Sequence, residues 1–282
     1  MLHEIRIAVR SLLRTPAFTA VAVLSLALGI GLNTTIFSAV NGLLLRPLPV
    51  AEPDRVVGIF TSDYSGPLYG GSSWADYADL RDNARSFELL AGVALQPVGL
   101  GTGEGSVVTI AQVVSGNFFT LVGQSPLRGR LLQPGDDRPD APAAAVISEP
   151  LWRGRFGADE AVIGRDLAIA GHRFTVVGVA PAGFTGTQRG IRTDLWLPAA
   201  TLPLIRPGAG SEDLVSRGAR GIAILGVLRP GVPEMVAQAE LHTLAAGLRA
   251  SYPDYWSDVR GEGRRLTLVP EAGLRLPPQL RG

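Results

Sequence analysis

One uncharged stretch, Thr15–Leu45, reads TPAFTAVAVLSLALGIGLNTTIFSAVNGLLL and contains no Asp, Glu, Lys, Arg or His. Arg14 precedes it and Arg46 follows it. The hydrocarbon core of a bilayer is about 30 Å thick, and a helix needs roughly 20 apolar residues to cross it. The stretch is therefore predicted to form a membrane-spanning helix. Its spanning residues include Phe18, Leu24, Leu28, Ile30 and Leu32.

Two other structures are compatible with an apolar run near the N-terminus: a helix buried in a soluble core and a cleaved signal peptide. A signal peptide has an apolar region of about 7–15 residues that ends at a cleavage site of the A-x-A type. The stretch here is longer and shows no clean site of that type. We therefore expect an uncleaved anchor.

The uncharged stretch is longer than a membrane requires. As a helix, residues 17–45 would reach about 43 Å at 1.5 Å per residue, so part of it should project beyond the bilayer as a stalk. The second half carries a helical stripe of apolar residues, which predicts a partner helix. This stripe consists of Ile36, Phe37, Val40, Leu43 and Leu44. The junction with the following domain is expected where prolines interrupt the helix, at Arg46, Pro47 and Pro49.

The segment before the span, Leu2–Leu13, has apolar residues at helical spacing and arginines at every fourth position on another face. A basic amphipathic helix beside a span typically lies in the membrane interface. Residues 1–16 are therefore expected to form an interfacial helix. Three arginines against the single Glu4 place this end in the cytoplasm and the rest of the chain outside it.

Small residues within the span indicate that it packs against another helix. Ser25 with Gly29, and Ala27 with Gly31, are pairs spaced four residues apart, which allow two helices to approach closely in lipid. Asn33 carries a polar amide at membrane depth, where such groups usually face another helix.

Composition excludes several classes of function. The 282 residues carry a net charge of +1, which gives no signal for nucleic acid. Cysteine is absent, so disulfides and thiol chemistry are excluded. All 26 basic residues are arginine, whereas the phosphate-binding loop of ATPases requires a lysine. Any ATP-driven work must therefore be powered by another chain.

Three longer helices and one short helix are predicted after the span. The pattern Ser73-x-x-Asp76 predicts a capped helix that ends near Arg85 and leaves Asp76, Asp79, Arg81 and Asp82 in solvent. Ser148 is expected to cap a second helix, through Phe156. The longest helix is expected from Pro233 to about Ala250.

The rest of the outer domain is predicted to be β-rich. A short helix is expected at 116–121, with Gly123 as its end, and Leu202–Gly221 is expected to be loop. The glycines between 99 and 105 predict a hairpin turn, since they lack the spacing of a dinucleotide-binding loop. Strands are expected at 55–60, 92–100, 105–114, 143–147, 195–197, 222–228 and 266–269, with a hairpin at 166–179 that turns at Gly171-His172.

No motif for catalysis or metal binding is found. His3, His172 and His242 fall in the interfacial segment, a hairpin turn and a helix, so nothing brings them together. The acidic pair Asp136–Asp137 lacks the ligand periodicity of an EF-hand, and like Glu212–Asp213 it is expected in a solvated loop. We therefore expect no enzyme activity, no cofactor and no metal.

Four groups of residues occur in a characteristic order: LALGIGLNTTIFS (26–38) followed by LLRPLP (44–49); AVIS (145–148) with Leu151-Trp152, Arg155-Phe156-Gly157 and Ile163-Gly164-Arg165; FTVVGVAP (174–181) with Gly183-Phe184; and LRPGV (228–232) before the last helix. By these motifs the chain resembles the N-terminal part of bacterial MacB/FtsX-type ABC transporter permeases, above all the acidobacterial-type permease group. The resemblance covers nearly the whole chain.

The resemblance implies an α+β fold, with one N-terminal transmembrane helix followed by a mixed α/β periplasmic domain of two subdomains. The helix and stalk would occupy 17–45 and the MacB-like periplasmic core 46–275. Within the core, 50–112 and 215–272 would form a porter-like subdomain and 113–214 an inserted β-rich subdomain. Residues 276–282 would be a loop that leads to a second span, which is missing here, so the chain looks like a fragment.

The family acts by mechanotransmission, so the resemblance implies a permease subunit of an ABC-type export system in the bacterial inner membrane. The implied partners are the lipid bilayer, a cytoplasmic ATPase subunit and a second permease half, in a homodimer or pseudo-dimer. A different class of function is compatible with the chain as it ends: a single-span, membrane-anchored binding or adhesion domain. A membrane-anchored periplasmic hydrolase is a third alternative.

Overall fold

The computed structural model describes residues 16–40, 48, 50, 52–64, 68–101, 105–188, 190–206, 208, 210 and 212–274. The chain divides into two compact units, Met1–Arg46 and Pro47–Gly282. Several predicted features lie outside the described residues. They are the helix at Leu2–Leu13, the stripe and junction residues Leu43, Leu44, Arg46, Pro47 and Pro49, and the loop at 276–282.

The described part of the first unit is a single helix, α2 (Pro16–Val40). Proline fits the first turn of a helix because its missing N–H would have no partner there. Within the helix, the hydroxyls of Thr34 and Thr35 donate to the carbonyl oxygens of Ile30 and Gly31, each at 2.7 Å. These two side chains therefore present no unbonded hydroxyl hydrogen at the helix surface.

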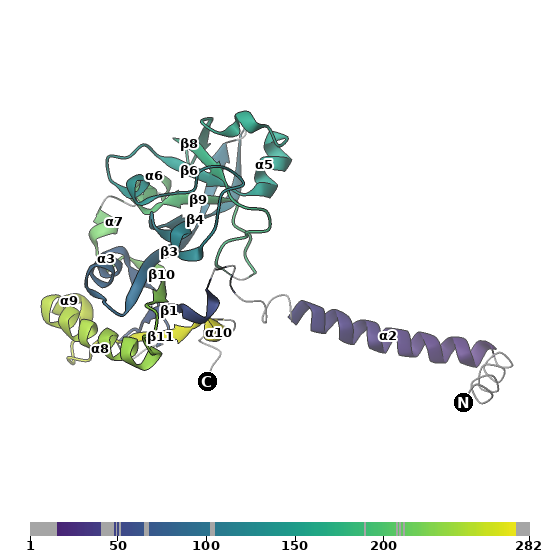
Figure 1. Cartoon of the computed structure of the whole chain (residues 1–282), viewed down its shortest axis with the longest axis horizontal. Coiled ribbons are helices and arrows are strands. Elements are labelled where there is room, and N and C mark those ends of the chain that lie inside the picture. Colours follow the sequence, from purple (N-terminus) through teal and green to yellow (C-terminus); the bar gives the residue numbers. More distant parts are fainter. Residues whose placement is uncertain are drawn as a thin grey trace. The chain divides into compact units, whose positions relative to one another are not determined.

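The second unit is built on one sheet whose strands follow the order β11-β1-β10-β3-β4-β9-β6-β8-β5 (Figure 1). In addition, β2 pairs with β10, and β7 pairs with both β3 and β8. The strand bounds are β1 (Val56–Thr61), β2 (Ser72–Ser73), β3 (Phe87–Gly101), β4 (Ser106–Val114), β5 (Arg128–Gly129), β6 (Ala144–Ile147), β7 (Asp166–Ile169), β8 (His172–Val179), β9 (Leu195–Pro198), β10 (Arg220–Leu228) and β11 (Leu266–Pro270).

Two longer helices accompany the open part of the sheet, and shorter ones lie along the connections (Figure 1). The helix bounds are α3 (Trp74–Asn83), α4 (Phe118–Val122), α5 (Glu149–Phe156), α6 (Leu202–Ile205), α7 (Glu212–Val215), α8 (Glu234–Ser251), α9 (Pro253–Trp256) and α10 (Glu271–Leu274), with short 3-10 turns at Pro53–Arg55, Pro134–Asp137, Glu160–Val162 and Ala199–Thr201. The side chain of Gln238 ties α8 to β11, because it bonds to both the carbonyl of Leu266 and the N–H of Leu268.

Part of the sheet closes on itself. The outer end of β3 meets β7 at Leu100 and Ile169, and β7 continues the sheet through β8. The strands β3, β4, β9, β6, β8 and β7 therefore form a ring, while β11, β1 and β10 extend from β3 as an open sheet. The ring and the open sheet share β3.

Side chains that point alternately to the two faces of the sheet form two apolar clusters, one on each face. On β10, Ile222 and Ile224 belong to the first cluster, together with side chains of α3 and α8, while Leu225 and Val227 belong to the second, with side chains of α4. Successive strand residues point to opposite faces, so one apolar strand contributes to both clusters. The predicted mixed α/β fold with one N-terminal apolar helix is confirmed; its division at residues 113–214 stays a prediction.

Local chemistry explains why these elements begin and end where they do. The hydroxyls of Ser73 and Ser148 accept the N–H groups of Asp76 and Leu151, as predicted for capped helices. Gly123 and Gly157 then end α4 and α5 in the left-handed conformation. The hairpin of β7 and β8 turns one residue earlier than predicted, because Ile169 pairs with His172.

Several local predictions are wrong. Asp76 is buried rather than solvated. The stretch expected as loop, Leu202–Gly221, contains α6, α7 and the start of β10, so Glu212 and Asp213 lie in a helix. The strand expected at 92–100 begins at Phe87, since its first half pairs with β10. The burial of Asp76 and the early start of β3 share a cause: their deciding partners lie far away in the sequence.

The acidic pair Asp136–Asp137 also departs from the expected solvated turn. Asp136 forms a bidentate ion pair with Arg130 at 2.6 and 2.7 Å. Asp137 accepts the N–H groups of Gly116 and Ala200, and burial raises the pKa of its carboxyl against the opposing effect of these bonds. Asp136 therefore ties its turn to the segment at Arg130, and Asp137 ties it to the segments at Gly116 and Ala200.

Candidate functional site

Helix α2 has the dimensions of a membrane span. Residues Pro16–Thr35 form a 20-residue segment long and apolar enough to cross a bilayer, which corresponds to about 30 Å at 1.5 Å per residue. The predicted spanning residues are all at least 62% exposed. They are Phe18, Leu24, Leu28, Ile30 and Leu32.

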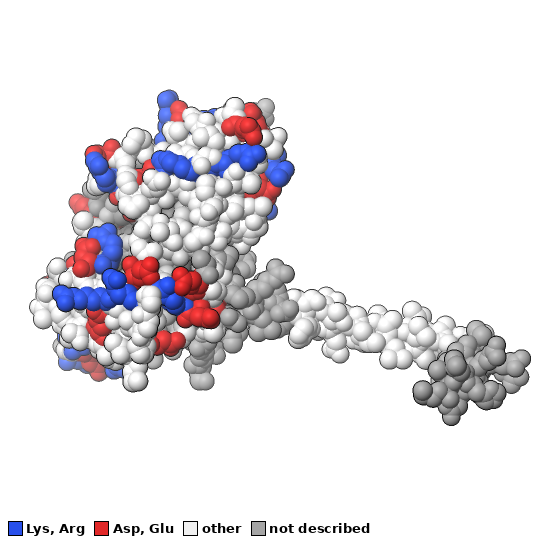
Figure 2. All heavy atoms as spheres, viewed as in Figure 1, with Lys and Arg blue, Asp and Glu red and all other residues white. Residues whose placement is uncertain are grey.

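The composition of α2 sets it apart from a core helix. Its apolar side chains occur on all sides, and no charged residue lies between Pro16 and Val40. The face of α2 seen in Figure 2 accordingly carries neither blue nor red atoms. A helix that is apolar all round is stable when its whole surface is buried, either in a large protein core or in a membrane. By length and composition, α2 therefore matches a helix that could cross a membrane.

Only part of the predicted stalk stripe lies within the described residues. Phe37 is 64% exposed near the end of α2. Ile36 and Val40 belong to the helix, but the structure describes their backbone only. The partner helix of the stripe stays a prediction.

A buried ion pair in the second unit joins α3 to the segment between α7 and β10. Asp76 and Arg217 are joined at 2.6 Å, with side chains only 3% and 10% exposed. Arg217 also binds Asp79 at 2.5 Å, and the indole N–H of Trp256 donates to Asp76 at 3.1 Å. The guanidinium of Arg217 lies over the ring of Tyr252, 3.4 Å from its centroid. This cluster fastens the segment after α7 to α3 and α9.

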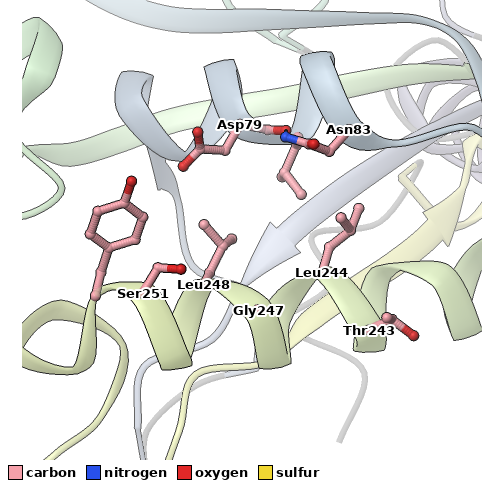
Figure 3. A pocket seen from close by; sticks show the side chains of 9 residues that line it. Asp79, Asn83, Thr243, Leu244, Gly247, Leu248 and Ser251 are labelled. Atoms are coloured by element: carbon pink, nitrogen blue, oxygen red, sulfur yellow. The ribbon is translucent and has the colours of Figure 1, made fainter.

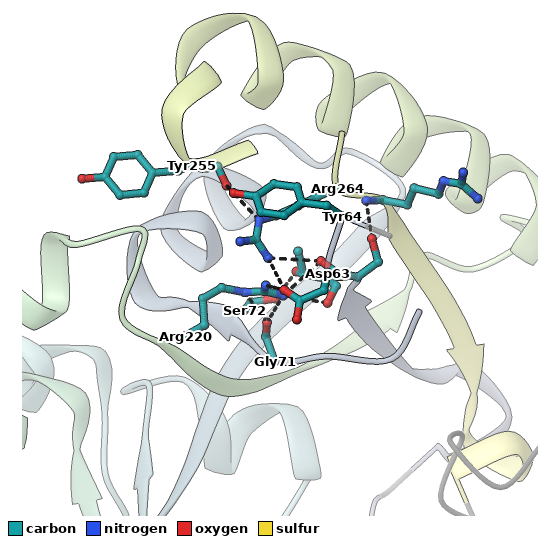
Figure 4. A network of polar contacts seen from close by, with 10 residues as sticks. Asp63, Tyr64, Gly71, Ser72, Arg220, Tyr255 and Arg264 are labelled. Atoms are coloured by element: carbon teal, nitrogen blue, oxygen red, sulfur yellow. Dashed lines mark hydrogen bonds and ion pairs between the residues drawn. The ribbon is translucent and has the colours of Figure 1, made fainter. Parts of the chain in front are cut away.

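A second polar network joins the ends of β1 and β10 (Figure 4). The carboxylate of Asp63 accepts from Arg220 at 2.7 Å and from Arg264 at 2.9 Å. Arg220 also donates to the carbonyl of Gly71 at 2.7 Å, and Arg264 lies over the ring of Tyr64 at 4.2 Å. Two guanidinium groups therefore share one carboxylate here. Neither network was foreseen, because no local pattern marks an arginine that bonds across the fold.

A groove of about 290 Å³ lies between α3 and α8 (Figure 3). Leu80, Leu244 and Leu248 give it an apolar lining, and polar side chains of both helices stand beside them. The carboxylate of Asp79 at this groove is already paired with Arg217. The groove can accommodate a small apolar group, but its lining offers no nucleophile with an adjacent base.

The described residues show no constellation for catalysis or metal binding. His172 begins β8 and His242 lies on α8, while His3 lies outside the described part of the chain. No group of three His, Cys, Asp or Glu side chains suited to a metal ion occurs among residues that the structure describes.

Comparison with known proteins gives one family and one fold. The family described as MacB-like periplasmic core domain matches residues 19–244. No curated protein sequence matches the chain.

Three solved structures share the fold at low sequence identity. The periplasmic region of MacB from Actinobacillus actinomycetemcomitans is 15% identical with a TM-score of 0.56, and the match covers 79% of this chain and 92% of that one. A domain of a predicted permease from Porphyromonas gingivalis is 18% identical with a TM-score of 0.57, covering 78% and 92%. The extracellular domain of the ABC-type transporter YknZ from Gram-positive bacteria is 11% identical with a TM-score of 0.51, covering 75% and 99%.

Proposed function

Because the chain belongs to the family of the MacB-like periplasmic core domain, we propose that it is the N-terminal portion of a permease subunit in an ABC-type export or mechanotransmission system. In this proposal, hydrolysis of ATP by a partner in the cytoplasm changes the conformation of the domain outside the membrane. Helix α2 connects the two sides.

The observation that carries the proposal is the apolar helix α2 next to a core domain of this family. The helix continues to Val40, beyond the 20 residues that cross the bilayer. Its extra turn and the apolar residues around Phe37 support a stalk that transmits movement. A plain anchor has no need for this length or for an apolar stripe.

The chain itself supplies no site for ATP hydrolysis in this proposal. It has no lysine for a phosphate-binding loop. In this proposal the ATPase is a partner in the cytoplasm. The small residues at Gly29 and Gly31, with open space beside them in the structure, support a close pairing of two permease halves through their spans.

The proposed orientation places residues 1–16 in the cytoplasm and the core domain in the periplasm of the inner membrane. The support comes from Arg6, Arg10 and Arg14 before the span, since cytoplasmic flanks carry an excess of basic residues.

Co-purification tests the proposed partnership. The tagged protein, expressed from its native operon with any coding sequence that continues after Gly282, is solubilised in mild detergent and captured. We expect an ATPase subunit to be retained in stoichiometric amount and ATP to alter the protease sensitivity of the core domain. Capture without an ATPase, together with an operon that encodes none, would instead favour a single-span anchored binding or adhesion domain.

A further inference from the structure

A cationic hollow lies between the second half of α8 and the segment that leads into β11. Its volume is about 420 Å³, and its lining consists of His242, Ala245, Ala246, Arg249, Arg264 and Arg265. Three of these six side chains are guanidinium groups and none is a carboxylate. The hollow is separate from the groove between α3 and α8.

Two features of the chain create this space. Ala245 and Ala246 form its floor, and their short side chains leave room above the helix. His242, Ala246 and Arg249 follow one another at helical spacing, so they share a face of α8. Arg265 lies on the other side of the hollow, just before β11 begins at Leu266. Its backbone N–H donates to the hydroxyl of Ser62.

The positive charge of the hollow is largely uncompensated. Arg264 shares Asp63 with Arg220. Arg249 and Arg265 are both exposed, and none of the carboxylates that the structure describes forms an ion pair with either one. Four guanidinium groups at this end of the sheet thus have one bound carboxylate between them. Guanidinium groups without a carboxylate partner are well suited to bind an external oxyanion.

Gly263, which has no side chain, leaves room for the guanidinium of Arg249. A Cβ atom added to Gly263 would fall 1.7 Å from Nη2 of Arg249 and 1.9 Å from its Cζ. The guanidinium therefore lies directly against the backbone of this glycine. Any larger residue at position 263 would push the flexible end of Arg249 out of place while the backbone remains undisturbed.

We propose that this hollow binds an oxyanion of the phosphate class, held by Arg249 and Arg265. Arg264 and His242 line the same hollow, but the guanidinium of Arg264 already donates to Asp63, Ser62 and Tyr255. Arg249 belongs to helix α8 and Arg265 to the segment before β11, so donors from two separate parts of the fold line the hollow. The volume exceeds the needs of a bare phosphate and leaves room for an organic substituent. The phosphate belongs either to a free phosphate or phosphomonoester or to a lipid headgroup.

Calorimetric titration tests the proposal. The full chain in micelles of a neutral detergent is titrated with inorganic phosphate, and separately with mixed micelles that contain phosphatidylglycerol or phosphatidylcholine. Saturable binding is expected with one of the two phosphate sources and not with sodium chloride at matched ionic strength. The double variant Arg249→Gln, Arg265→Gln should weaken that binding by about tenfold or more, the effect of losing hydrogen bonds to a charged group.

Two single variants make the test specific. Gly263→Ala should also weaken binding several-fold, because it moves Arg249 without removing a charge. Arg260→Gln removes an exposed positive charge close in sequence but outside the hollow, so it should change the affinity by less than about twofold. Circular dichroism of each variant confirms that it is folded.

The outcomes distinguish the two phosphate sources from each other and also show when the proposal fails. Saturable binding of inorganic phosphate that the double variant abolishes identifies a free phosphate or phosphomonoester. The same behaviour with phosphatidylglycerol micelles alone identifies a headgroup. The proposal is overturned if neither probe saturates, if chloride gives the same heats, or if Arg260→Gln weakens binding as much as the double variant.

Discussion

At the scale of single residues, the ion pair of Asp76 and Arg217 is the interaction with the largest expected effect. Arg217→Met would leave a nearly fully buried carboxylate without its cation, since the two side chains are 3% and 10% exposed. Removal of one partner from a buried pair typically costs about 3–5 kcal/mol. We expect the free energy of unfolding in urea to fall by about 3 kcal/mol, the lower end of this range, because Trp256 still donates to Asp76.

Arg138→Met is the matched control. Its partner is Asp140, and the two side chains are 66% and 70% exposed. Exposed pairs contribute about 0–1 kcal/mol, so this variant should be almost as stable as the parent protein. Equal losses in the two variants would show that burial does not govern the Asp76–Arg217 pair.

A second residue-scale prediction concerns pH. Glu240 on α8 accepts the N–H groups of Arg85 at 2.7 Å and Ser86 at 2.8 Å. Burial acts to raise the pKa of this carboxyl, but the two N–H bonds outweigh it and lower the pKa. A lowered pKa in the folded state means that the ionised form stabilises the fold. This contribution is complete above the unfolded-state pKa and is lost as the pH falls through the folded-state pKa.

Glu240→Gln should therefore be less stable than the parent by about 1 kcal/mol at neutral pH. The difference should shrink as the pH falls from about 7 to about 3, because the parent carboxyl becomes protonated. Urea unfolding at several pH values measures this difference in stability. Glu262→Gln, at an exposed position, is the control. A difference that stays constant over this range would contradict the assigned cause.

The residues also show what a sequence can reveal. The caps at Ser73 and Ser148 were predictable because donor and acceptor lie three residues apart. The partner of Asp76 was not, because Arg217 is 141 positions away in a stretch that lacks any periodic pattern. A capping aspartate usually faces solvent, so the local pattern gave the wrong burial for this side chain.

At the scale of elements, the contact between β8 and the segment around β5 leaves no space for a side chain at Gly178. A Cβ atom there would lie 1.8 Å from the carbonyl oxygen of Arg130, a backbone atom that cannot move aside easily. Gly178→Ala should destabilise the protein by about 1–3 kcal/mol, the usual cost of overpacking. Thermal unfolding measures the change.

Gly154→Ala provides the opposite case. Gly154 lies in α5, and nothing stands within 4 Å of its would-be Cβ atom. Alanine has the better helix propensity by up to about 1 kcal/mol, so this variant should be as stable as the parent or slightly more stable. A loss of stability here similar to that of Gly178→Ala would refute the steric explanation.

The stalk at the end of α2 gives the functional prediction for an element. Phe37→Asp and Val40→Asp place a charge on the proposed stripe beyond the membrane-spanning segment Pro16–Thr35. We expect both variants to insert into the membrane normally but to lose coupling between ATP hydrolysis and transport in the full-length permease. Membrane fractionation and ATPase-dependent transport measure the two effects.

Ser38→Asp is the control for the stripe, since it introduces the same charge next to Phe37 on another face of α2. It should retain coupling. Unchanged activity in Phe37→Asp and Val40→Asp would reduce the stalk to a plain anchor.

Elements with strong local periodicity were predicted well. The apolar face of α8 contains Ala237, Leu241, Ala245 and Leu248, all buried as the 3.6-residue period requires. The short helices α6 and α7 were missed because four residues are too few to establish a period. The roles of the stalk stripe and of the junction at Arg46, Pro47 and Pro49 stay predictions, since most of these side chains lie outside the described residues.

At the scale of the whole molecule, the absence of cysteine makes the proposed orientation directly measurable. Val259 is fully exposed in the core domain. A cysteine placed there by Val259→Cys should react with a membrane-impermeant maleimide in spheroplasts. Ser11→Cys, in the proposed cytoplasmic segment, should react only after permeabilisation. The reverse pattern would invert the assigned topology.

The arrangement of the central strands also has a consequence for biosynthesis. Strand β1 forms its ladders with β10 and β11, and Val56 of β1 faces Val227 of β10. The last residue of β1, Thr61, also bridges Gly70 nearby in the sequence. About 170 residues must therefore be translated before Val56 acquires its partner on β10. At about 5–20 residues per second, this wait is on the order of ten to thirty seconds. The ring from β3 to β9 can close during that time, whereas the first residues of β1 wait for β10 with an open edge that could pair with a wrong strand.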